Sequence, residues 1–291
     1  MEGQAGAGWG IMTDLTWKNA ATVNPYVPQM AEVIETITET PTIKTVVMRP
    51  APPMTFRAGQ FVQLTLPGLG EAPFTPSSSP YECERLEVTI LRTGRVTEAL
   101  HRVSPGEFLG VRGGFGKGYP IDKLAGKDVL VVGGGVGLAP LRALILALFH
   151  DIDAIKRLVI LYGARAPEEL LYQRLYDEWS KKPKTTMHVT IDRPAPGWTG
   201  RTGVVTTLFD SLDVDLANTV VFSCGPEIML KFATLGLLEK GFKPEQIYLS
   251  MNRRMSCGIG KCGRCNIGPY YLCKDGPDMN YAKIMNYPNV F

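Results

Sequence analysis

The first half of the chain carries short runs of apolar residues that alternate with polar ones. Four runs are rich in Val, Ile, Thr and Leu and are set apart largely by Gly and Pro: residues 33–38, 42–48, 61–66 and 86–92. Alternation with a period of two is typical of strands that bury one face. Several short strands at this spacing predict a small antiparallel barrel. Residues 97–103 predict one short helix within it.

From residue 127 the pattern changes its period. Mainly apolar segments at residues 128–132, 157–162, 186–191, 219–223 and 246–250 predict strands. The segments between them predict helices at residues 138–149, 167–181, 204–210 and 227–239, and the second of these opens with Pro at a first-turn position. Alternating strands and helices predict a parallel sheet that helices cover on both faces.

The chain of 291 residues is long enough for about two domains and a small appendage. We predict an N-terminal arm at residues 1–28, a β domain at 29–124, an α/β domain at 125–251 and a cysteine-rich loop with a tail at 252–291. The arm begins with a Gly-rich stretch, and two prolines break its last five residues. It is either a disordered tail or a segment that folds onto a partner subunit.

Composition excludes several classes of protein. Hydrophobic residues make up 45% and charged residues 20% of the chain, as in soluble globular proteins. The net charge of +3 is too small to indicate nucleic-acid binding, and no basic stripe interleaved with aromatic residues is present. The longest apolar run, at residues 143–149, is far shorter than the roughly 20 residues of a membrane span. With no secretory signal pattern at the N-terminus, we expect a cytoplasmic protein.

Four of the six cysteines fall close together near the C-terminus, with the spacing C-x4-C-x2-C-x7-C: Cys257, Cys262, Cys265 and Cys273. The first three match the plant-type [2Fe–2S] spacing. Three glycines among them let the backbone wrap closely and point N–H groups at sulfur. A zinc site usually has two C-x2-C pairs, whereas one is present, and a disulfide framework suits a short secreted chain. The sequence therefore favours an iron–sulfur cluster, with zinc as the alternative.

A glycine-rich turn joins a predicted buried strand to a predicted helix. It contains Gly133, Gly134, Gly135, Val136 and Gly137. Glycines here allow a sharp turn and close approach of a pyrophosphate, which the helix N-terminus can bind. The turn departs from G-x-G-x-x-G, and no acidic residue follows about 20 residues later. Nucleotide binding is favoured, and tight packing alone is the alternative.

The motif of Cys224, Gly225 and Pro226 ends a strand at the carboxyl edge of the predicted sheet. Ligands of open α/β sheets bind at this edge. A lone Cys after an apolar strand is also common as a small buried residue. Because the glycine-rich turn lies at the same edge, a position near a bound ligand is favoured.

Together these motifs resemble the ferredoxin-NADP reductase superfamily. Over residues 24–276 the order is a β domain, Gly-Gly-Gly-x-Gly-x-Ala-Pro, Tyr-Gly-Ala-Arg, Cys-Gly-Pro, and the cysteine loop followed by Asp-Gly-Pro. The chain is most similar to electron-transfer subunits of dihydroorotate dehydrogenase, cytosolic sulfhydrogenase or [NiFe] hydrogenase, and anaerobic sulfite reductase. The resemblance implies an all-β flavin-binding barrel, an α/β parallel-sheet nucleotide-binding domain and a C-terminal [2Fe–2S] loop.

The resemblance implies FAD on the barrel. The family's Arg-x-Tyr-Ser motif corresponds to residues 72–75, where Phe74 would lie against the flavin ring and Thr75 near its reactive nitrogen. Ala72 stands where the family has an arginine that contacts the FAD phosphates. A second flavin segment would face the pyrophosphate with Arg92, Gly94, Val96 and Thr97.

The resemblance also implies a nicotinamide nucleotide at the glycine-rich turn, with Cys224 beside the nicotinamide. Asp192 aligns with a residue that meets the adenosine ribose and favours NADH, because a carboxylate accepts from the 2′-hydroxyl and repels a 2′-phosphate. Arg165, Arg193 and Arg201 leave NADPH open. The tail departs from relatives, which usually continue Asp-Gly-Pro-Val-Phe where this chain has Asp-Gly-Pro-Asp-Met.

These sites predict an oxidoreductase subunit that passes electrons between NAD(P)H, FAD and a [2Fe–2S] cluster. Cys224 and Thr75 are its candidate catalytic residues. Nothing in the sequence would bind a terminal substrate, so we expect partner subunits in a hetero-oligomer, first a cytosolic [NiFe] hydrogenase. The same module also suits a sulfite reductase, a dihydroorotate dehydrogenase or a heterodisulfide-reductase-linked complex. A reductase acting alone on soluble ferredoxin and a zinc-bearing nucleotide sensor are further alternatives.

Overall fold

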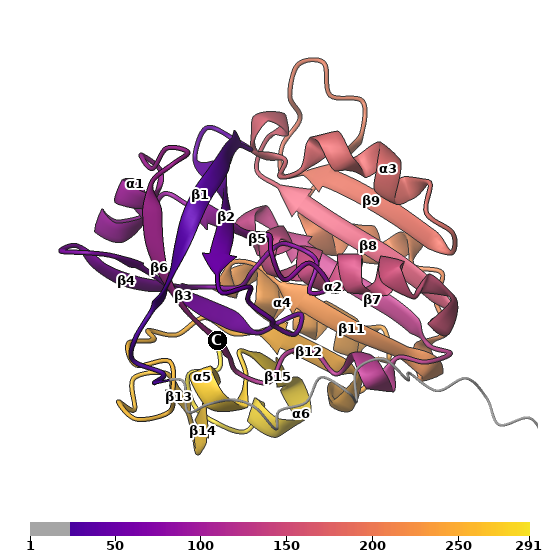
Figure 1. Ribbon diagram of the computed structural model, residues 1–291. Coiled ribbons are helices and arrows are strands. Elements are labelled where there is room, and N and C mark those ends of the chain that lie inside the picture. The colour runs from indigo at the N-terminus through magenta and orange to yellow at the C-terminus, as the bar shows by residue number, and fades with distance from the viewer. Residues whose placement is uncertain (1–23) are drawn as a thin grey trace, which may run out of the picture.

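The computed structural model describes residues 24–291. Its N-terminal part is a six-stranded antiparallel sheet in the order β4-β3-β6-β1-β2-β5, with the short helix α1 (Arg95–Leu100) packed against β3, β4 and β5 (Figure 1). The strands are β1 (Gln29–Thr38), β2 (Ile43–Ala51), β3 (Phe61–Leu66), β4 (Gly70–Phe74), β5 (Leu86–Leu91) and β6 (Phe108–Phe115).

The four strands expected in this part of the chain are confirmed, and two more complete the sheet. The segment of β4 lacks β-branched residues, but β3 pairs with it from Val62–Phe74 to Leu66–Gly70. Helix α1 begins two residues earlier than expected. The hydroxyl of Thr97 accepts the backbone N–H of Gly94 at 2.9 Å and so stabilises the first turn.

The second sheet has seven strands in the order β10-β9-β8-β7-β11-β12-β15. Six of them run parallel, and five of these were expected. The sequence analysis missed the short parallel strand β10 and the antiparallel edge strand β15 (Asp278–Asn280). The parallel strands are β7 (Asp128–Gly134), β8 (Arg157–Ala164), β9 (Thr185–Ile191), β10 (Arg201–Thr202), β11 (Thr219–Cys224) and β12 (Ile247–Ser250).

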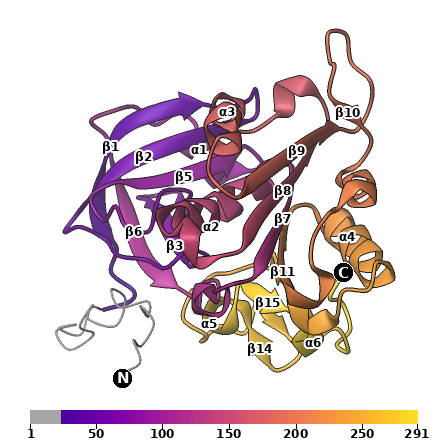
Figure 2. The same ribbon diagram turned by 90° about the vertical axis from the view of Figure 1, so that its right-hand side faces the viewer.

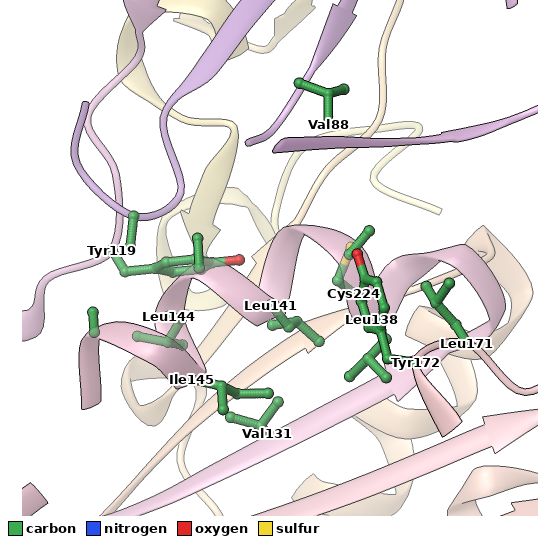
Figure 3. Packing of buried hydrophobic residues seen from close by; sticks show 14 of the residues in the cluster. Val88, Tyr119, Val131, Leu138, Leu141, Leu144, Ile145, Leu171, Tyr172 and Cys224 are labelled. Atoms are coloured by element: carbon green, nitrogen blue, oxygen red, sulfur yellow. The ribbon is translucent and has the colours of Figure 1, made fainter. Parts of the chain in front are cut away.

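Helices cover both faces of this sheet, as expected. Figure 2 shows α2 (Leu138–His150) on the face toward the six-stranded sheet and α4 (Glu227–Glu239) on the opposite face. Figure 3 shows Leu138, Leu141 and Ile145 of α2 among the buried side chains that join the two parts of the molecule. These three residues and Val88 of β5 belong to one continuous hydrophobic core.

An ion pair fastens the two parts at the same place. Glu87 of β5 and Arg142 of α2 form a salt bridge, and their side chains are 9% and 12% exposed. Arg142 Nη1 also donates to the carbonyl oxygen of Ser77 at 2.9 Å. Because both charges are nearly buried, each depends on the other for compensation. The relative placement of the two sheets is thus fixed by packing and by a specific polar contact.

The predicted helix at residues 167–181 is wrong. A 3₁₀ turn (Pro167–Glu169) is followed by Tyr172 in the left-handed region with φ 62°, a second 3₁₀ turn (Gln173–Leu175) and the short helix α3 (Tyr176–Ser180). The buried Tyr172 hydroxyl lies 2.5 Å from that of Thr89 in β5. Tyr172 thus makes a contact distant in sequence and, at the same position, has a left-handed backbone that interrupts the helix. The helix expected at 204–210 is a 3₁₀ helix, Val205–Ser211.

The C-terminal segment lies at the bottom of the view in Figure 1, where its strand β15 joins the second sheet. It consists of β13 (Asn266–Ile267), β14 (Tyr270–Tyr271), α5 (Leu272–Asp275), β15 and α6 (Tyr281–Ile284). Of the predicted arm, residues 1–23 lie outside the described residues, and Pro28 packs on Gly110 of β6. Within residues 24–291, no helix has the length and apolarity that a membrane crossing requires.

Candidate functional site

The carboxyl ends of four neighbouring strands bring most of the predicted nucleotide-site residues to one edge of the sheet. Cys224 at the end of β11 pairs with Gly133 of β7, and Gly134 pairs with Gly163 of β8. Asp192 directly follows β9, and its N–H donates to the carbonyl of Ala164 at 2.9 Å. Arg165, Asp192 and Arg193 are exposed at this edge. The parallel order β9-β8-β7-β11 therefore assembles a continuous surface from segments far apart in the sequence.

The glycine-rich turn continues from β7 into a 3₁₀ turn (Gly135–Gly137) and then α2. Gly135 has φ +54°, a conformation that favours glycine. The buried Tyr162 of β8 supports the turn, because its hydroxyl donates to the carbonyl of Gly135 at 3.1 Å and accepts the N–H of Leu171 at 3.1 Å. Sequence reasoning gave Tyr162 no role, since its partner lies 27 residues away.

Close packing is one function of these glycines. A Cβ on Gly134 would meet Met229 Sδ at 2.2 Å, and one on Gly225 would meet Met229 Cε at 2.6 Å. A Cβ on Gly137 would lie 2.3 Å from the carbonyl oxygen of Cys224. The turn is thus seated directly on the Cys-Gly-Pro segment. The glycines at these positions therefore allow the two motifs to pack against each other.

Replacing Gly137 by Ala is expected to destabilise the fold by about 2 kcal/mol or more, because a methyl group would clash with rigid backbone. Chemical unfolding followed by circular dichroism measures the change. Gly133→Ala is the matched control, since its Cβ would meet its nearest neighbours at an ordinary 3.4 Å. Equal stability of the two variants would contradict the close seating of Gly137 on Cys224.

Cys224 is buried at the inner end of this edge, 8% exposed. Burial raises the pKa of its thiol to about 12, and the nearby charge of Asp278 adds to the shift. The thiol therefore stays neutral at physiological pH. The thiolate is the nucleophilic form, so Cys224 is not suited to nucleophilic attack.

The predicted flavin residues lie on two adjoining elements of the first sheet. Phe74 ends β4 and is half-buried, as is Thr75 after it. Helix α1 packs against β4 and carries Val96 and Thr97, with Gly94 as the residue before the helix. Arg92 instead lines a hollow of about 480 Å³ that Lys44, His101 and Arg102 also line.

The cysteine loop directs backbone N–H groups at sulfur. Cys257 Sγ accepts the N–H groups of Ile259, Lys261 and Cys262 at 3.5, 3.3 and 3.4 Å. Burial opposes ionisation of Cys257, but these N–H donors outweigh it and lower its pKa to about 6. Left-handed glycines allow this wrapping, as predicted from the sequence: Gly258, Gly260 and Gly263, with φ +77°, +75° and +74°.

The other two predicted ligands form a buried pair. Cys265 Sγ and Cys273 Sγ lie 3.4 Å apart, and Cys273 Sγ accepts the N–H of Gly260 at 3.1 Å. Burial, together with the neighbouring Cys265 thiol, raises the pKa of Cys273 to about 12. No disulfide joins any of the six cysteines, all of which the structure describes. Within residues 24–291, no three His, Cys, Asp or Glu side chains gather as ligands of a single metal ion.

The cysteine loop is tied to the first sheet by Arg112 of β6, a residue the sequence analysis did not single out. Arg112 Nη1 donates to the carbonyl oxygens of Cys257 and Pro25 at 2.9 and 3.0 Å. Its Nε and Nη2 donate to both carboxylate oxygens of Glu71 in β4 at 2.9 and 2.6 Å. The hydrogen bond from Arg112, against the opposing effect of burial, lowers the pKa of Glu71. One buried side chain thus joins the loop, β4 and the start of the described chain.

Two family models match this chain. Residues 131–234 match the oxidoreductase NAD-binding domain, and residues 252–285 match the iron–sulfur cluster binding domain of dihydroorotate dehydrogenase B. The first covers the glycine-rich turn and Cys224, and the second covers all four clustered cysteines. These matches agree with the two sites that the sequence motifs indicate.

Curated relatives match along most of their length. The gamma subunit of sulfhydrogenase 1 from Pyrococcus furiosus is 36% identical over 281 residues, which is 92% of this chain and 95% of the relative. A probable electron-transfer subunit of dihydroorotate dehydrogenase B from Methanocaldococcus jannaschii is 33% identical over 253 residues, which is 86% of this chain and 88% of the relative.

Solved structures share the fold. An NADH-dependent reduced ferredoxin-NADP oxidoreductase, studied for flavin-based electron bifurcation, has a TM-score of 0.70 at 26% identity, over 88% of this chain and 91% of that chain. A ferredoxin NADP⁺ reductase from Neisseria gonorrhoeae with bound FAD and NADP has a TM-score of 0.66 at 20% identity, over 76% of this chain and 96% of that chain.

Proposed function

Since this chain belongs to the family of sulfhydrogenase gamma subunits and dihydroorotate dehydrogenase B electron-transfer subunits, we propose that it passes electrons between NAD(P)H, FAD and a [2Fe–2S] cluster and exchanges them with a partner catalytic subunit. The observation that carries this proposal is the adjacency of three sites in one chain. The nucleotide edge is fixed to the first sheet by α2, and Arg112 fixes the cysteine loop to that sheet. A flavin, when bound, couples the two-electron chemistry of a nicotinamide to the one-electron chemistry of a cluster.

The four cysteines would hold the cluster as two pairs. Cys257 accepts the N–H of Cys262, and Cys265 lies 3.4 Å from Cys273. Two sulfurs bound at about 2.3 Å to one tetrahedral ion lie about 3.8 Å apart, so the spacing of Cys265 and Cys273 suits one metal ion, and Cys257 and Cys262 would hold the other. The four N–H groups that point at Cys257 and Cys273 stabilise thiolates, and this supports the donor set.

The first sheet would serve as the flavin-binding barrel. Phe74 would lie against the flavin ring and Thr75 would hydrogen-bond near its reactive nitrogen. Gly94, Val96 and Thr97 would face the pyrophosphate. The packing of α1 on β4 supports this assignment, because the segments proposed to meet the ring and the pyrophosphate lie on adjoining elements. Arg92 would approach a phosphate from the basic hollow between α1 and β2.

The nicotinamide nucleotide would bind along the carboxyl edge of the second sheet. Gly133, Gly134, Gly135, Val136 and Gly137 would meet its pyrophosphate, and Cys224, Gly225 and Pro226 would contact the nicotinamide. Asp192, with Arg165 and Arg193 beside it, would meet the adenosine ribose. A carboxylate at that point supports NADH over NADPH.

The partner that we favour is a hydrogenase of the kind that a sulfhydrogenase gamma subunit serves. The match to the sulfhydrogenase gamma subunit, at 36% identity over 92% of this chain, supports this choice over a dihydroorotate dehydrogenase, matched at 33% over 86%. Cys262 is exposed between exposed Lys261 and Arg264. Electrons would therefore enter or leave on this side of the loop. An all-thiolate cluster suits the reducing cytoplasm, where we place the complex.

An anaerobic titration of the purified chain with NADH tests the function directly. Visible absorption should show bleaching of a flavin band together with a broad iron–sulfur band, and iron and acid-labile sulfide should be present in equal amounts. NADPH, titrated in parallel, should give a weaker response because Asp192 repels the 2′-phosphate. A reconstituted protein that contains zinc and no flavin would contradict the proposal and favour a nucleotide sensor.

A further inference from the structure

A carboxyl group lies next to Cys224 and has no role in the three sites above. Asp278 opens β15, where it pairs with Ser250 of β12. Its carboxylate accepts a hydrogen bond from the Ser250 hydroxyl, which lies 3.2 Å from the hydroxyl of Tyr119. Ser250 also lies beside Cys224 at the carboxyl edge, because Ser223 of β11 pairs with Leu249 of β12. The side chains of Tyr119 and Asp278 thus meet the Ser250 hydroxyl next to Cys224.

Neighbouring groups crowd this half-buried carboxyl. A Cβ on Gly59 would lie 2.5 Å from Asp278 Oδ2, so only glycine leaves room for it. The Tyr119 ring is 4% exposed and packs edge-on against Phe222 of β11 at 5.1 Å between ring centroids. Burial raises the pKa of Asp278 to about 7, although hydrogen bonds from Ser250 and Tyr119 oppose the shift. Asp278 therefore changes its charge near physiological pH.

The two oxidation states of a nicotinamide differ in charge at the ring. The oxidised ring is positive and the reduced ring is neutral. A carboxylate within about 7 Å of a positive ring, at an effective dielectric constant of about 20, changes its affinity by on the order of tenfold or more. The same carboxylate has little effect on a neutral ring.

We propose that Asp278 is a specificity residue for the oxidation state of the nicotinamide, and that its carboxylate favours the oxidised ring over the reduced ring beside Cys224. This inference rests on the proposed function, which places the nicotinamide at Cys224. The charge of Asp278 then sets how readily the site releases or retains NAD⁺. Retention of NAD⁺ at higher pH would favour electron flow from NADH into the chain.

Asp278 is the group of this cluster that titrates between pH 6 and 8. The pKa of Cys224 is about 12, and burial raises the pKa of Tyr119 well above its usual value, so both stay neutral. On the adjoining segments, Lys117 and Asp275 pair with each other at 3.7 Å. The three histidines lie elsewhere, at the end of α1, at the end of α2 and in β9.

Nucleotide binding to the holoprotein tests the proposal. By linkage, NAD⁺ should bind about fivefold to tenfold more tightly at pH 8 than at pH 6, whereas the dissociation constant of NADH should change little. Asp278→Asn keeps the size and hydrogen bonds of the side chain but cannot ionise. This variant should lose the pH dependence and bind NAD⁺ about tenfold more weakly at pH 8. Asp210→Asn, at an exposed residue paired with Lys240, is the control for loss of one negative charge.

The outcomes separate this inference from the proposed function. If NADH binds but the affinity for NAD⁺ depends neither on pH nor on Asp278, the inference alone is overturned. Absence of binding by either nucleotide would overturn both. The stability of the protein without nucleotide, measured against pH, tests the titration of the Asp278 carboxyl itself. Because the folded pKa lies above the unfolded value, the wild type should lose stability as pH rises from about 4 to about 7, and Asp278→Asn should not.

Discussion

Replacing Arg112 by Ala is expected to lower the free energy of unfolding by about 2–3 kcal/mol, because it removes a buried guanidinium and the charge-assisted hydrogen bonds that it makes. The Arg112 side chain is 6% exposed and that of Glu71 is 28% exposed. Without Arg112, the Glu71 carboxylate loses both of its hydrogen bonds from the guanidinium, and the carbonyl oxygen of Cys257 loses its donor. Urea unfolding with a fluorescence readout measures the loss.

The same substitution should also loosen the cysteine loop, so iron content per protein should fall. Arg49→Ala is the matched control. Arg49 also pairs with a glutamate of the first sheet, but its side chain is 61% exposed and that of Glu32 is 40% exposed. Exposed pairs contribute about 0–1 kcal/mol. Arg112→Lys should give an intermediate loss, because Lys keeps the charge without the two-pronged geometry. Equal stability of the Arg112→Ala and Arg49→Ala variants would show that the contact does not hold the loop.

The arrangement of strands followed from the sequence wherever apolar periodicity and burial agree. The parallel strands β7, β8 and β11 are buried on both faces and read as apolar runs. Two failures have a common physical cause. The segment of β4 has little strand propensity and becomes a strand by pairing with β3. The segment 167–181 has a helical pattern but is interrupted at Tyr172, whose hydroxyl contacts Thr89. Contacts distant in sequence override local preference in both cases.

The same distinction separates the site residues that the sequence indicates from those it does not. The cysteines and the glycine-rich turn act through spacing within a few residues, so their pattern is readable. Arg112 acts on a carbonyl 145 residues away, and Tyr119 meets Ser250 across 131 residues. In the sequence, Asp278 stands out only because relatives usually have Val at this position. Its significance follows from the antiparallel pairing of β15, which places it beside Ser250. A single sequence carries no signal for such pairings.

Replacing Cys262 by Ser is expected to reduce electron transfer to an external one-electron acceptor by on the order of 100-fold, because a thiolate ligand of the cluster is lost. Reduction of the flavin by NADH should keep its normal rate, since the nucleotide edge lies on a different part of the fold. Cys262 is the appropriate ligand to change. It is exposed, whereas Cys265 and Cys273 are buried in the hydrophobic core, where substitution would also damage the fold.

Anaerobic stopped-flow absorption separates the two steps, with flavin bleaching as one signal and reduction of a viologen dye as the other. Cys83→Ser is the matched control, because Cys83 is an exposed thiol that belongs to none of the three sites. The control should transfer electrons at the wild-type rate. If the Cys262→Ser variant also reduced the dye at that rate, the cluster would not lie between the flavin and the acceptor. The flavin would then serve the acceptor directly, and the position of the cysteine loop next to β6 would have a structural role only.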